Sequence, residues 1–597
     1  MYLHATHALA TRNFKPMRWI HSNMTHSSPR LGEQLLDALD PDQRVIAEHL
    51  RGPVSVLAGA GTGKTRVITH RIAHGVSVGA YSPEKVMAVT FTRKAAGEMQ
   101  ARLKSLGVDG VRAATFHSAA LAQLSYFWPH IVGGSAPSVL NHKVSVLSQA
   151  AESMGLKLQG ATLRDVAAEI EWRKVSMLDI DRYAQLFTAD VQPRTLINGV
   201  SLEQLIELHQ LYAQLLEDRR QIDFEDVLIL TAGMLQTEPR AAVQVHERYR
   251  FFTVDEYQDV SPLQHALLRE WLGDRDDLCV VGDASQTIYS FAGASSRYLL
   301  QFGREFEHAT EYQLVRNYRS VSEIVTVANT LMKDRVGALT LTAQRTQVNP
   351  QQQAVSAEWF SDEQDEANAV AHAIAQTISS GIAASDIAVL YRANAQSARV
   401  ESALASLGIS SRVLGAQRFF DRAEVKQAVM MIRAQSKVQD ERPLFQIVTD
   451  ILRSLGYSSQ PPGGDQARES WDNLQALLTI VDEQPPGATM LSLAQDLTQR
   501  SQVHHEPTVD AVTLSAVHSA KGLEWNVVHL IGMSEGVFPS AYASTEADFN
   551  EERRLAYVAF TRAREQLRIS GSSHAGKNTQ RASRFIAESG VSFSSAV

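Results

Sequence analysis

The segment 58–65, with the sequence AGAGTGKT, constrains this chain more than any other feature. It follows the apolar run 54–57, which predicts a buried strand, and it precedes 66–72, whose apolar residues fall on one face of a helix. A strand, a glycine-rich turn and a helix in this order are the context of a phosphate-binding P-loop. The alternative is an ordinary glycine-rich turn, and the Gly-Lys-Thr ending between strand and helix argues against it.

Each part of this loop has a chemical reason. Glycines leave no Cβ in the way, so successive backbone N–H groups curl around phosphate oxygens, and the helix N-terminus adds its dipole. Lys64 reaches the β- and γ-phosphates, and Thr65 offers its hydroxyl to Mg²⁺. Ala58 stands where the consensus has its first glycine, and a small residue still fits there. The predicted nucleotide-binding residues of the loop are Ala58, Gly59, Ala60, Gly61, Thr62, Gly63, Lys64 and Thr65.

The composition bounds the class of protein. A chain of 597 residues with 44% hydrophobic and 20% charged residues predicts a globular protein of several domains. Cys279 is the only cysteine, which excludes disulfides within the chain and fits a cytoplasmic protein. No run of about 18 apolar residues occurs, so no membrane span is predicted. The net charge of −8 argues against coating duplex DNA by bulk charge, but not against a local groove that stacks a strand.

Apolar strand runs occur in two groups, separated by stretches whose pattern is mostly helical. Unbroken apolar strands are typical of parallel sheets covered on both faces, so the expected fold class is α/β. The first group is 86–91, 251–254 and 278–283, and the second is 387–391, 512–517, 527–531 and 566–570. The first expected α/β domain comprises 31–118 and 222–310, and its helical insertion is 119–221. The second comprises 311–416 and 506–590, and its shortened helical insertion is 417–505. A disordered or non-native tail is expected at 1–30, and a second tail at 591–597.

Two acidic residues, Asp255 and Glu256, end an apolar strand that follows the P-loop in the chain. Acids at this place hold Mg²⁺ and act on the attacking water in P-loop ATPases. We therefore expect Asp255 to hold Mg²⁺, directly or through water, and Glu256 to orient or deprotonate the water. By itself an Asp-Glu pair at a strand end is more commonly a solvated turn, and the P-loop is what favours the catalytic interpretation.

Ten sequence elements then occur in one order. They are Gln43, the P-loop, TFTRKAAGEM at 90–99, TFHS at 115–118, VDEYQD at 254–259, VGDASQTIYSF at 281–291, NYRS at 317–320, LYRANAQS at 390–397, VHSAKGLE at 517–524 and YVAFTRA at 557–563. In sequence and order the chain resembles the UvrD/Rep/PcrA group of superfamily 1 DNA helicases, over about residues 38–590.

This resemblance implies two RecA-like P-loop domains with parallel sheets, each with a mainly helical insertion. ATP would bind between them and single-stranded DNA would lie across their top, with movement in the 3′-to-5′ direction. The implied cofactors are ATP and Mg²⁺. The implied partners are single-stranded DNA and 3′-tailed duplex DNA, together with proteins of DNA repair or replication at the nucleoid.

The resemblance also assigns roles at the nucleotide. Arg319 and Arg562 match two arginines that neutralise the γ-phosphate as it leaves, and because they belong to the second domain, hydrolysis would require closure of the cleft. Outside the motifs, a surface salt bridge or a core position would be the preferred interpretation of such residues. The other matching residues are Gln43 at the adenine edge, Tyr318 stacked on the adenine, Arg66 beside the nucleotide, Glu524 at the ribose and Gln286 at the γ-phosphate.

A second set of matching residues concerns DNA. Aromatic rings stack on bases without regard to sequence, which suits a protein that moves along a strand. For Phe585 the alternative is a buried core residue at the end of a helix. The predicted DNA-contacting residues are Phe91, His117, Tyr289, Phe291, Asn394, His518 and Phe585.

Two departures from the family pattern bear on function. Ala292 replaces an arginine that the family often has, and the insertion at 417–505 is short and lacks the Gly-Ile-Gly element expected to grip duplex DNA. Three hypotheses follow: a DNA helicase, a strand translocase that displaces proteins with little unwinding, and a regulatory ATP-binding protein that does not move. Glu256, Gln286 and the two arginines are intact, which argues against the third.

Overall fold

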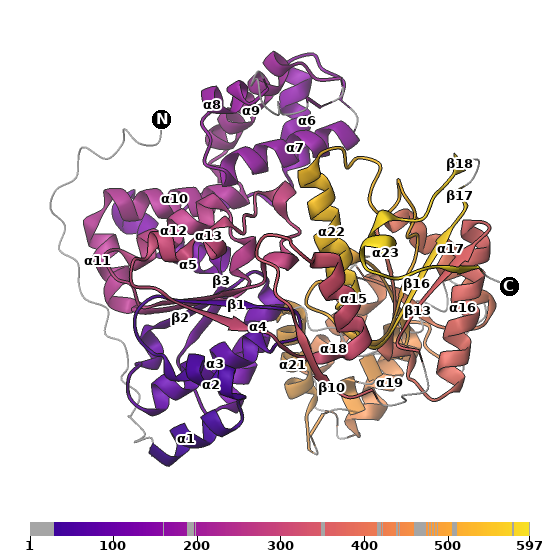
Figure 1. Cartoon of the computed structure of the whole chain (residues 1–597). Coiled ribbons are helices and arrows are strands. Elements are labelled where there is room, and N and C mark those ends of the chain that lie inside the picture. The colour runs from indigo at the N-terminus through magenta and orange to yellow at the C-terminus, as the bar shows by residue number, and fades with distance from the viewer. Residues whose placement is uncertain are drawn as a thin grey trace. The chain divides into compact units, whose positions relative to one another are not determined.

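The computed structural model describes residues 29–595 except 159, 188–195, 198, 348–352, 415–419, 421, 438–439, 441, 459–472, 476, 479, 483, 486, 504–509 and 576–577. The chain divides into two compact units (Figure 1). The first unit comprises Met1–Leu57, Lys64–Gly282 and Tyr289–Gln313, and the second comprises Ala58–Gly63, Asp283–Ile288 and Leu314–Val597. Two short loops, 58–63 and 283–288, therefore group with the second unit although each directly follows a strand of the first.

The first unit contains a six-stranded sheet with the strand order β3-β2-β6-β7-β1-β8. Its registers between β1 and β7, β2 and β3, β2 and β6, and β6 and β7 are all parallel. The strands β2, β6 and β7 are buried along their whole length, which confirms the parallel α/β prediction. The strands are β1 (Val54–Ala58), β2 (Val86–Thr90), β3 (Arg112–Thr115), β6 (Phe251–Val254), β7 (Leu278–Gly282) and β8 (Thr310–Leu314).

Helices of the first unit bury an aromatic core. The Trp271 ring stacks on Phe116 with centroids 5.7 Å apart, and its indole N–H donates to Gln123 Oε1 at 2.8 Å. This bond satisfies the polar end of a tryptophan that is otherwise fully buried. The helices are α1 (Pro29–Asp37), α2 (Pro41–Glu48), α3 (Lys64–Ser77), α4 (Arg93–Ser105), α5 (Phe116–Ile131), α10 (Phe224–Thr237), α11 (Pro239–Arg248), α12 (Pro262–Leu272), α13 (Arg297–Leu300) and α14 (Phe302–Glu305).

A helical group within the first unit has a core of its own. Its elements are β4 (Ser138–Val139), α6 (Lys143–Ser153), α7 (Gly160–Val175), α8 (Ile180–Gln185), α9 (Leu202–Asp218) and β5 (Gln221–Ile222), and the helices lie together apart from β1–β3 in Figure 1. Val166 and Tyr212 are among its fully buried residues. Lys174 in α7 donates to Asp223 at 2.8 Å and to Asp226 at 2.7 Å, and these ion pairs anchor the group to α10.

The second unit contains a seven-stranded sheet with the order β13-β14-β12-β15-β16-β11-β19. All of its defined registers are parallel. Smaller pairs are β9 with β10, which is parallel, and β17 with β18, which is antiparallel. The strands are β9 (Arg316–Val321), β10 (Thr342–Arg345), β11 (Val355–Phe360), β12 (Ile387–Tyr391), β13 (Ser411–Val413), β14 (Val512–Ala516), β15 (Trp525–Leu530), β16 (Ala563–Ser572), β17 (His574–Ala575), β18 (Asn578–Thr579) and β19 (Ser594–Ser595).

The helices of the second unit fall into two sets. Those that pack with the sheet are α15 (Ser322–Met332), α16 (Glu363–Ser379), α17 (Ser397–Ser406) and α22 (Glu546–Phe560), and α23 (Arg584–Glu588) packs on α15. The others, α18 (Ala423–Gln435), α19 (Leu444–Ser454) and α21 (Met490–Val503), share a separate apolar core that includes Ile432 and Leu452. The domain boundaries expected from the sequence stay predictions, and the expected tail at 1–30 lies almost entirely outside the described residues. No described helix is long and apolar enough to cross a membrane.

Candidate active site and nucleic-acid interface

The glycine-rich loop follows β1 and leads directly into α3, as the sequence predicts. Gly61 and Gly63 have φ angles of 69° and 83°, in the left-handed region that favours glycine. Thr62 closes the turn, because its Oγ1 donates to the Gly59 carbonyl at 2.9 Å. A Cβ on Gly61 would lie 2.7 Å from the Arg319 Cβ, so this glycine is required for space as well as for conformation.

The first turn of α3 meets the end of β6. Thr65 Oγ1 donates to Asp255 Oδ2 at 3.0 Å. Burial and, to a smaller extent, the neighbouring Glu256 carboxylate raise the pKa of Asp255 to about 6, although Lys64 opposes both effects. A hydroxyl and a carboxylate oxygen side by side fit Mg²⁺, which takes one or two protein oxygens and completes its shell with phosphate and water. Among the described residues there is no cluster of three or more His, Cys, Asp or Glu side chains suited to a metal.

The backbone of Glu256 is in an unusual conformation. Its φ and ψ are 54° and 39°, in the left-handed region, and its N–H donates to Asp255 Oδ1 at 2.9 Å. A non-glycine residue in this region costs on the order of 1–3 kcal/mol and persists where its surroundings enforce it. Gln258, which is fully buried, donates through Nε2 to Glu256 Oε2 at 2.5 Å and helps to fix the carboxylate.

Gln286 lies in the short loop that follows β7. Its Nε2 donates to Asp283 Oδ2 at 2.7 Å, and its side chain is buried. Lys521 Nζ donates to the Gln286 carbonyl at 2.7 Å. Asp283 therefore fixes the Gln286 amide, which is predicted to contact the γ-phosphate. Lys521, from the VHSAKGLE motif, fixes the backbone of Gln286.

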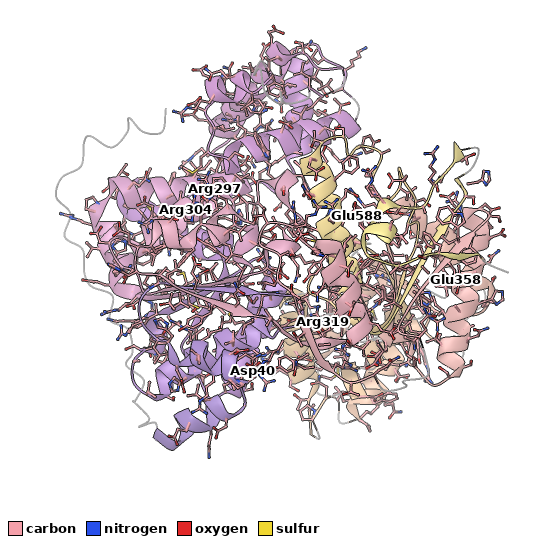
Figure 2. The ribbon with its side chains drawn as sticks, viewed as in Figure 1. Asp40, Arg297, Arg304, Arg319, Glu358 and Glu588 are labelled. Carbon is pink, nitrogen blue, oxygen red and sulfur yellow. The ribbon has the colours of Figure 1, made fainter. Side chains whose placement is uncertain are left out.

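The two predicted arginine fingers meet at Thr561 in the second unit. Arg319, labelled in Figure 2, donates through Nη1 to the Thr561 carbonyl at 3.1 Å and forms an ion pair with Glu524. Arg562 is only 1% exposed, and its Nη2 donates to Thr561 Oγ1 at 3.1 Å. Burial opposes ionisation of Glu524, but Arg319 and Arg564 prevail and lower the pKa of this carboxyl. Glu524, which was predicted to contact the ribose, therefore also forms an ion pair with the predicted arginine finger Arg319.

The residues predicted at the base differ in accessibility. Gln43 is 2% exposed and belongs to a capping box at the start of α2, where Asp40 (Figure 2) accepts from the Gln43 N–H at 2.9 Å. Arg66 is exposed and donates to the Ala38 carbonyl. Tyr318 is 43% exposed and its N–H donates to the Gly61 carbonyl at 2.9 Å, so an accessible ring lies beside the glycine-rich loop.

Three predicted DNA-contacting aromatics form one cluster in the first unit. Phe91 stacks on Tyr289 with centroids 5.4 Å apart and planes 12° from parallel. Phe291 meets Tyr289 edge-on at 6.1 Å and is 65% exposed. Bases provide flat faces that match accessible rings of this kind.

His117 lies beside Phe224, an aromatic residue that the sequence pattern did not indicate as functional. Its ring centroid is 4.8 Å from that of Phe224, which is 45% exposed. Burial, with a smaller effect of Lys143, lowers the pKa of His117 to about 4, so the ring is neutral near pH 7. The signal for Phe224 was its position in Asp223-Phe224-Glu225-Asp226, where an apolar residue stands among acids.

Two predicted DNA-contacting residues of the second unit are accessible. Asn394 is exposed in the turn after β12, and His518 is half-buried in the turn after β14. Burial and the nearby Arg392 cation lower the pKa of His518 to about 4. A neutral imidazole both donates and accepts hydrogen bonds, which suits contact with a strand without adding charge.

The assignment of Phe585 to DNA stacking was wrong. Phe585 is fully buried, meets Phe538 edge-on at 6.1 Å, and has the Arg553 guanidinium 5.6 Å from its ring centre. Neither face of the ring is open to a base. The alternative left open by the sequence, a buried core residue, is the one that the structure supports.

Two family models match the chain. The UvrD/REP helicase N-terminal domain matches residues 39–307, and the UvrD-like helicase C-terminal domain matches 312–461 and 457–574. Together these matches span every element on which the candidate sites are built, apart from Phe585.

Curated proteins are similar over nearly the whole chain. The "ATP-dependent DNA helicase UvrD2" of Mycobacterium tuberculosis is 41% identical over 580 residues, covering 93% of this chain and 82% of that protein. The "ATP-dependent DNA helicase UvrD1" of the same organism is 30% identical over 674 residues, covering 91% and 83%. The "ATP-dependent DNA helicase PcrA" of Bacillus subtilis is 28% identical over 653 residues, covering 94% and 86%.

Proposed function

The chain belongs to the UvrD-like family of helicases, and we propose that it hydrolyses ATP to move 3′ to 5′ along single-stranded DNA and to separate 3′-tailed duplexes. The observation that carries this proposal is the hydrogen bond from Thr65 Oγ1 to Asp255 Oδ2, 3.0 Å long, at the end of a glycine-rich loop. It supports a P-loop ATPase site in which the metal ligands are already adjacent.

In this proposal the loop 58–63 cradles the phosphates and Lys64 neutralises them. Mg²⁺, when bound by Thr65 and Asp255, supplies charge stabilisation at the β- and γ-phosphates. Glu256 accepts a proton from the attacking water or orients it. Arg319 and Arg562 offset the charge that develops as the γ-phosphate leaves.

Hydrolysis draws on residues of both units, which suggests how DNA controls it. Lys64, Asp255 and Glu256 belong to the first unit, whereas Arg319 and Arg562 belong to the second. We propose that a strand bound to DNA-contacting residues of both units favours the arrangement competent for turnover. ATPase activity is then low alone and rises strongly with single-stranded DNA.

A second candidate function is a translocase that displaces proteins with little unwinding of its own. The alignment with the Bacillus subtilis PcrA protein runs over 653 positions, more than the 597 residues of this chain, so that relative contains segments which this chain lacks. The insertion at 417–505, predicted to be shortened, is where we place part of this difference. Weaker binding of duplex DNA by this insertion would reduce unwinding and would leave movement along a bare strand intact.

Three measurements in one buffer at fixed salt separate these functions, since phosphate contacts weaken as salt rises. ATPase activity is compared with and without single-stranded DNA, strand displacement is compared on 3′-tailed and 5′-tailed duplexes, and release of a protein block is measured on a bare strand. A helicase unwinds only the 3′-tailed duplex, and a translocase releases the block but unwinds poorly. Equal ATPase activity with and without DNA would contradict both. Lys64→Ala is the control, expected to abolish turnover and retain DNA binding.

A further inference from the structure

One helix of the second unit, α22, holds an ion pair that no step above uses. Glu552 is 7% exposed, and its Oε1 accepts from Arg392 Nε at 3.0 Å and from Arg392 Nη2 at 2.7 Å, while its Oε2 accepts from the same Nε at 3.0 Å. Its second oxygen also accepts from the Ser540 backbone N–H at 3.0 Å. The Arg392 side chain is 26% exposed, but the Glu552 carboxylate is buried, so a two-pronged pair of this kind keeps the Glu552 charge from being left unpaired in a dry environment.

The partner of Glu552 belongs to a candidate DNA-contacting turn. Arg392 directly follows β12 and precedes exposed Asn394 by two residues. The charges of Arg392 and Glu552 both act on the imidazole of His518, so this second candidate contact lies in the same group. Through Arg392, Glu552 therefore connects α22 to Asn394 and His518, the two residues of the second unit that are predicted to contact the strand.

Two residues that follow Glu552 in α22, Arg554 and Tyr557, bond to the loops on the nucleotide side. Arg554 Nε donates to the Thr287 carbonyl at 2.6 Å, one residue after Gln286. The hydroxyl of Tyr557 accepts from the Ala60 N–H at 3.4 Å. Both partner loops, 58–63 and 283–288, belong to the second unit together with α22. From Glu552 to Tyr557 the helix rises only about 7.5 Å.

We propose that α22 couples the nucleotide loops to the DNA-contacting turns, with Glu552 and Arg554, two positions apart in the middle of the helix, as positioning residues. Glu552 holds Arg392 so that Asn394 and His518 keep the geometry that a strand needs. Arg554 holds the Thr287 carbonyl so that a shift at Gln286 is passed to the helix. The inference rests on the proposed function, and neither residue touches nucleotide or DNA in this scheme.

The first test is Glu552→Gln, which keeps the shape and removes the charge. We expect the dissociation constant for a fluorescent single strand to rise about tenfold, as when a charge-assisted hydrogen bond is lost. The DNA concentration for half-maximal ATPase should rise in parallel, with the maximal rate within about twofold of the parent, because the hydrolytic residues are intact. Parental strand affinity would overturn the role of Glu552.

A matched control lies on the same helix. Arg553 donates to Glu588 of α23 at 2.7 Å, and Glu588 is labelled beside this helix in Figure 2. Glu588→Gln also breaks a partly buried ion pair of α22, but one that leads to no candidate DNA contact. We expect parental strand affinity for it. An equal loss in both variants would mean that α22 is merely destabilised, which contradicts the proposal.

Three further variants complete the test. Arg392→Gln alone and combined with Glu552→Gln should weaken strand binding to the same extent as Glu552→Gln, because all three break one pair. Multiplying losses would show that the residues act separately. Arg554→Gln should lower the maximal DNA-stimulated rate several-fold with strand affinity unchanged, and a parental maximal rate would overturn its role. If the parent shows no DNA stimulation, the proposed function fails, and the strand affinities still test Glu552 independently.

Discussion

The ring of Phe91 stacks on the ring of Tyr289, although the two residues are 198 positions apart, in loops that follow different strands. Their centroids are 5.4 Å apart. Phe291 then extends the pair outward as the most exposed member. The Phe91–Tyr289 stack and the edge-on contact of Phe291 with Tyr289 support the orientation of the outermost ring, on which a base can lie.

Replacing this outermost ring should weaken the grip on DNA. We expect Phe291→Ala to lower the affinity for single-stranded DNA by about 1–3 kcal/mol, the contribution of stacking one base. Nucleotide affinity should not change. Fluorescence anisotropy with a labelled strand measures the effect. Tyr126→Ala, which removes a 40% exposed ring outside the cluster, serves as the control and should bind like the parent. Equal losses would point to general destabilisation.

The metal requirement should depend on Thr65. Thr65→Val keeps the shape of the side chain and removes the hydroxyl that bonds Asp255. The Mg²⁺ concentration for half-maximal ATPase activity should rise on the order of tenfold, as metal sites that lose a supporting group typically do. Removing Mg²⁺ with a chelator should stop turnover in the parent.

Thr69→Val is the matched control for this change. It removes a hydroxyl from the same helix, but one that bonds only the carbonyls of Thr65 and Arg66. Its Mg²⁺ dependence should stay parental. If Thr65→Val also keeps the parental dependence, the metal is held without this hydroxyl.

Gly61 is expected to tolerate no side chain. Gly61→Ala places a Cβ in the left-handed region, at about 1–2 kcal/mol, and also 2.7 Å from the Arg319 Cβ. Nucleotide binding should fall about tenfold or more, since the loop must move to relieve this contact. Gly79→Ala imposes the same kind of strain at φ 73° with nothing within 4 Å, and it should bind nucleotide normally. Calorimetric titration with a non-hydrolysable ATP analogue distinguishes the two.

The sequence predicted the central strands of both sheets, because buried parallel strands are continuous apolar runs. It missed edge strands such as β13 (Ser411–Val413) and β8 (Thr310–Leu314), whose residues are largely polar and only partly buried. It also assigned Phe585 to DNA and overlooked Phe224. An aromatic residue looks the same in sequence whether the fold buries it or exposes it, and only the packing of distant segments decides between the two.

Acid should destabilise the protein through buried neutral histidines. Burial, with a smaller effect of Arg568, lowers the pKa of His529 to about 3. The unfolded chain takes up a proton near pH 6.5 and the folded chain does not, so stability is complete above that pH and falls as pH drops toward 3. In this window one such histidine changes the unfolding constant about tenfold per pH unit.

Urea unfolding at pH 7 and pH 5 measures this effect. His529→Asn should have a smaller loss of stability between the two pH values than the parent, whatever its stability at pH 7. His130→Asn, at an exposed position, should keep the parental difference. An unchanged difference in His529→Asn would show that other groups dominate the acid response.

The last prediction concerns the loop that joins the nucleotide to the aromatic cluster. Gln286 donates to Asp283 at 2.7 Å and stands only three residues before Tyr289. A small displacement at Gln286 on loss of the γ-phosphate is therefore passed along a short segment to the rings. We expect Gln286→Ala to lose DNA stimulation and translocation at least tenfold while ATP affinity changes less than about threefold. Stopped-flow translocation on labelled strands and nucleotide titration provide the two values. Gln344→Ala, at an exposed position of the second unit, should leave both unchanged. If Gln286→Ala translocates like the parent, the Gln286 amide only stabilises the turn through Asp283, and the signal from the nucleotide reaches the strand by another route.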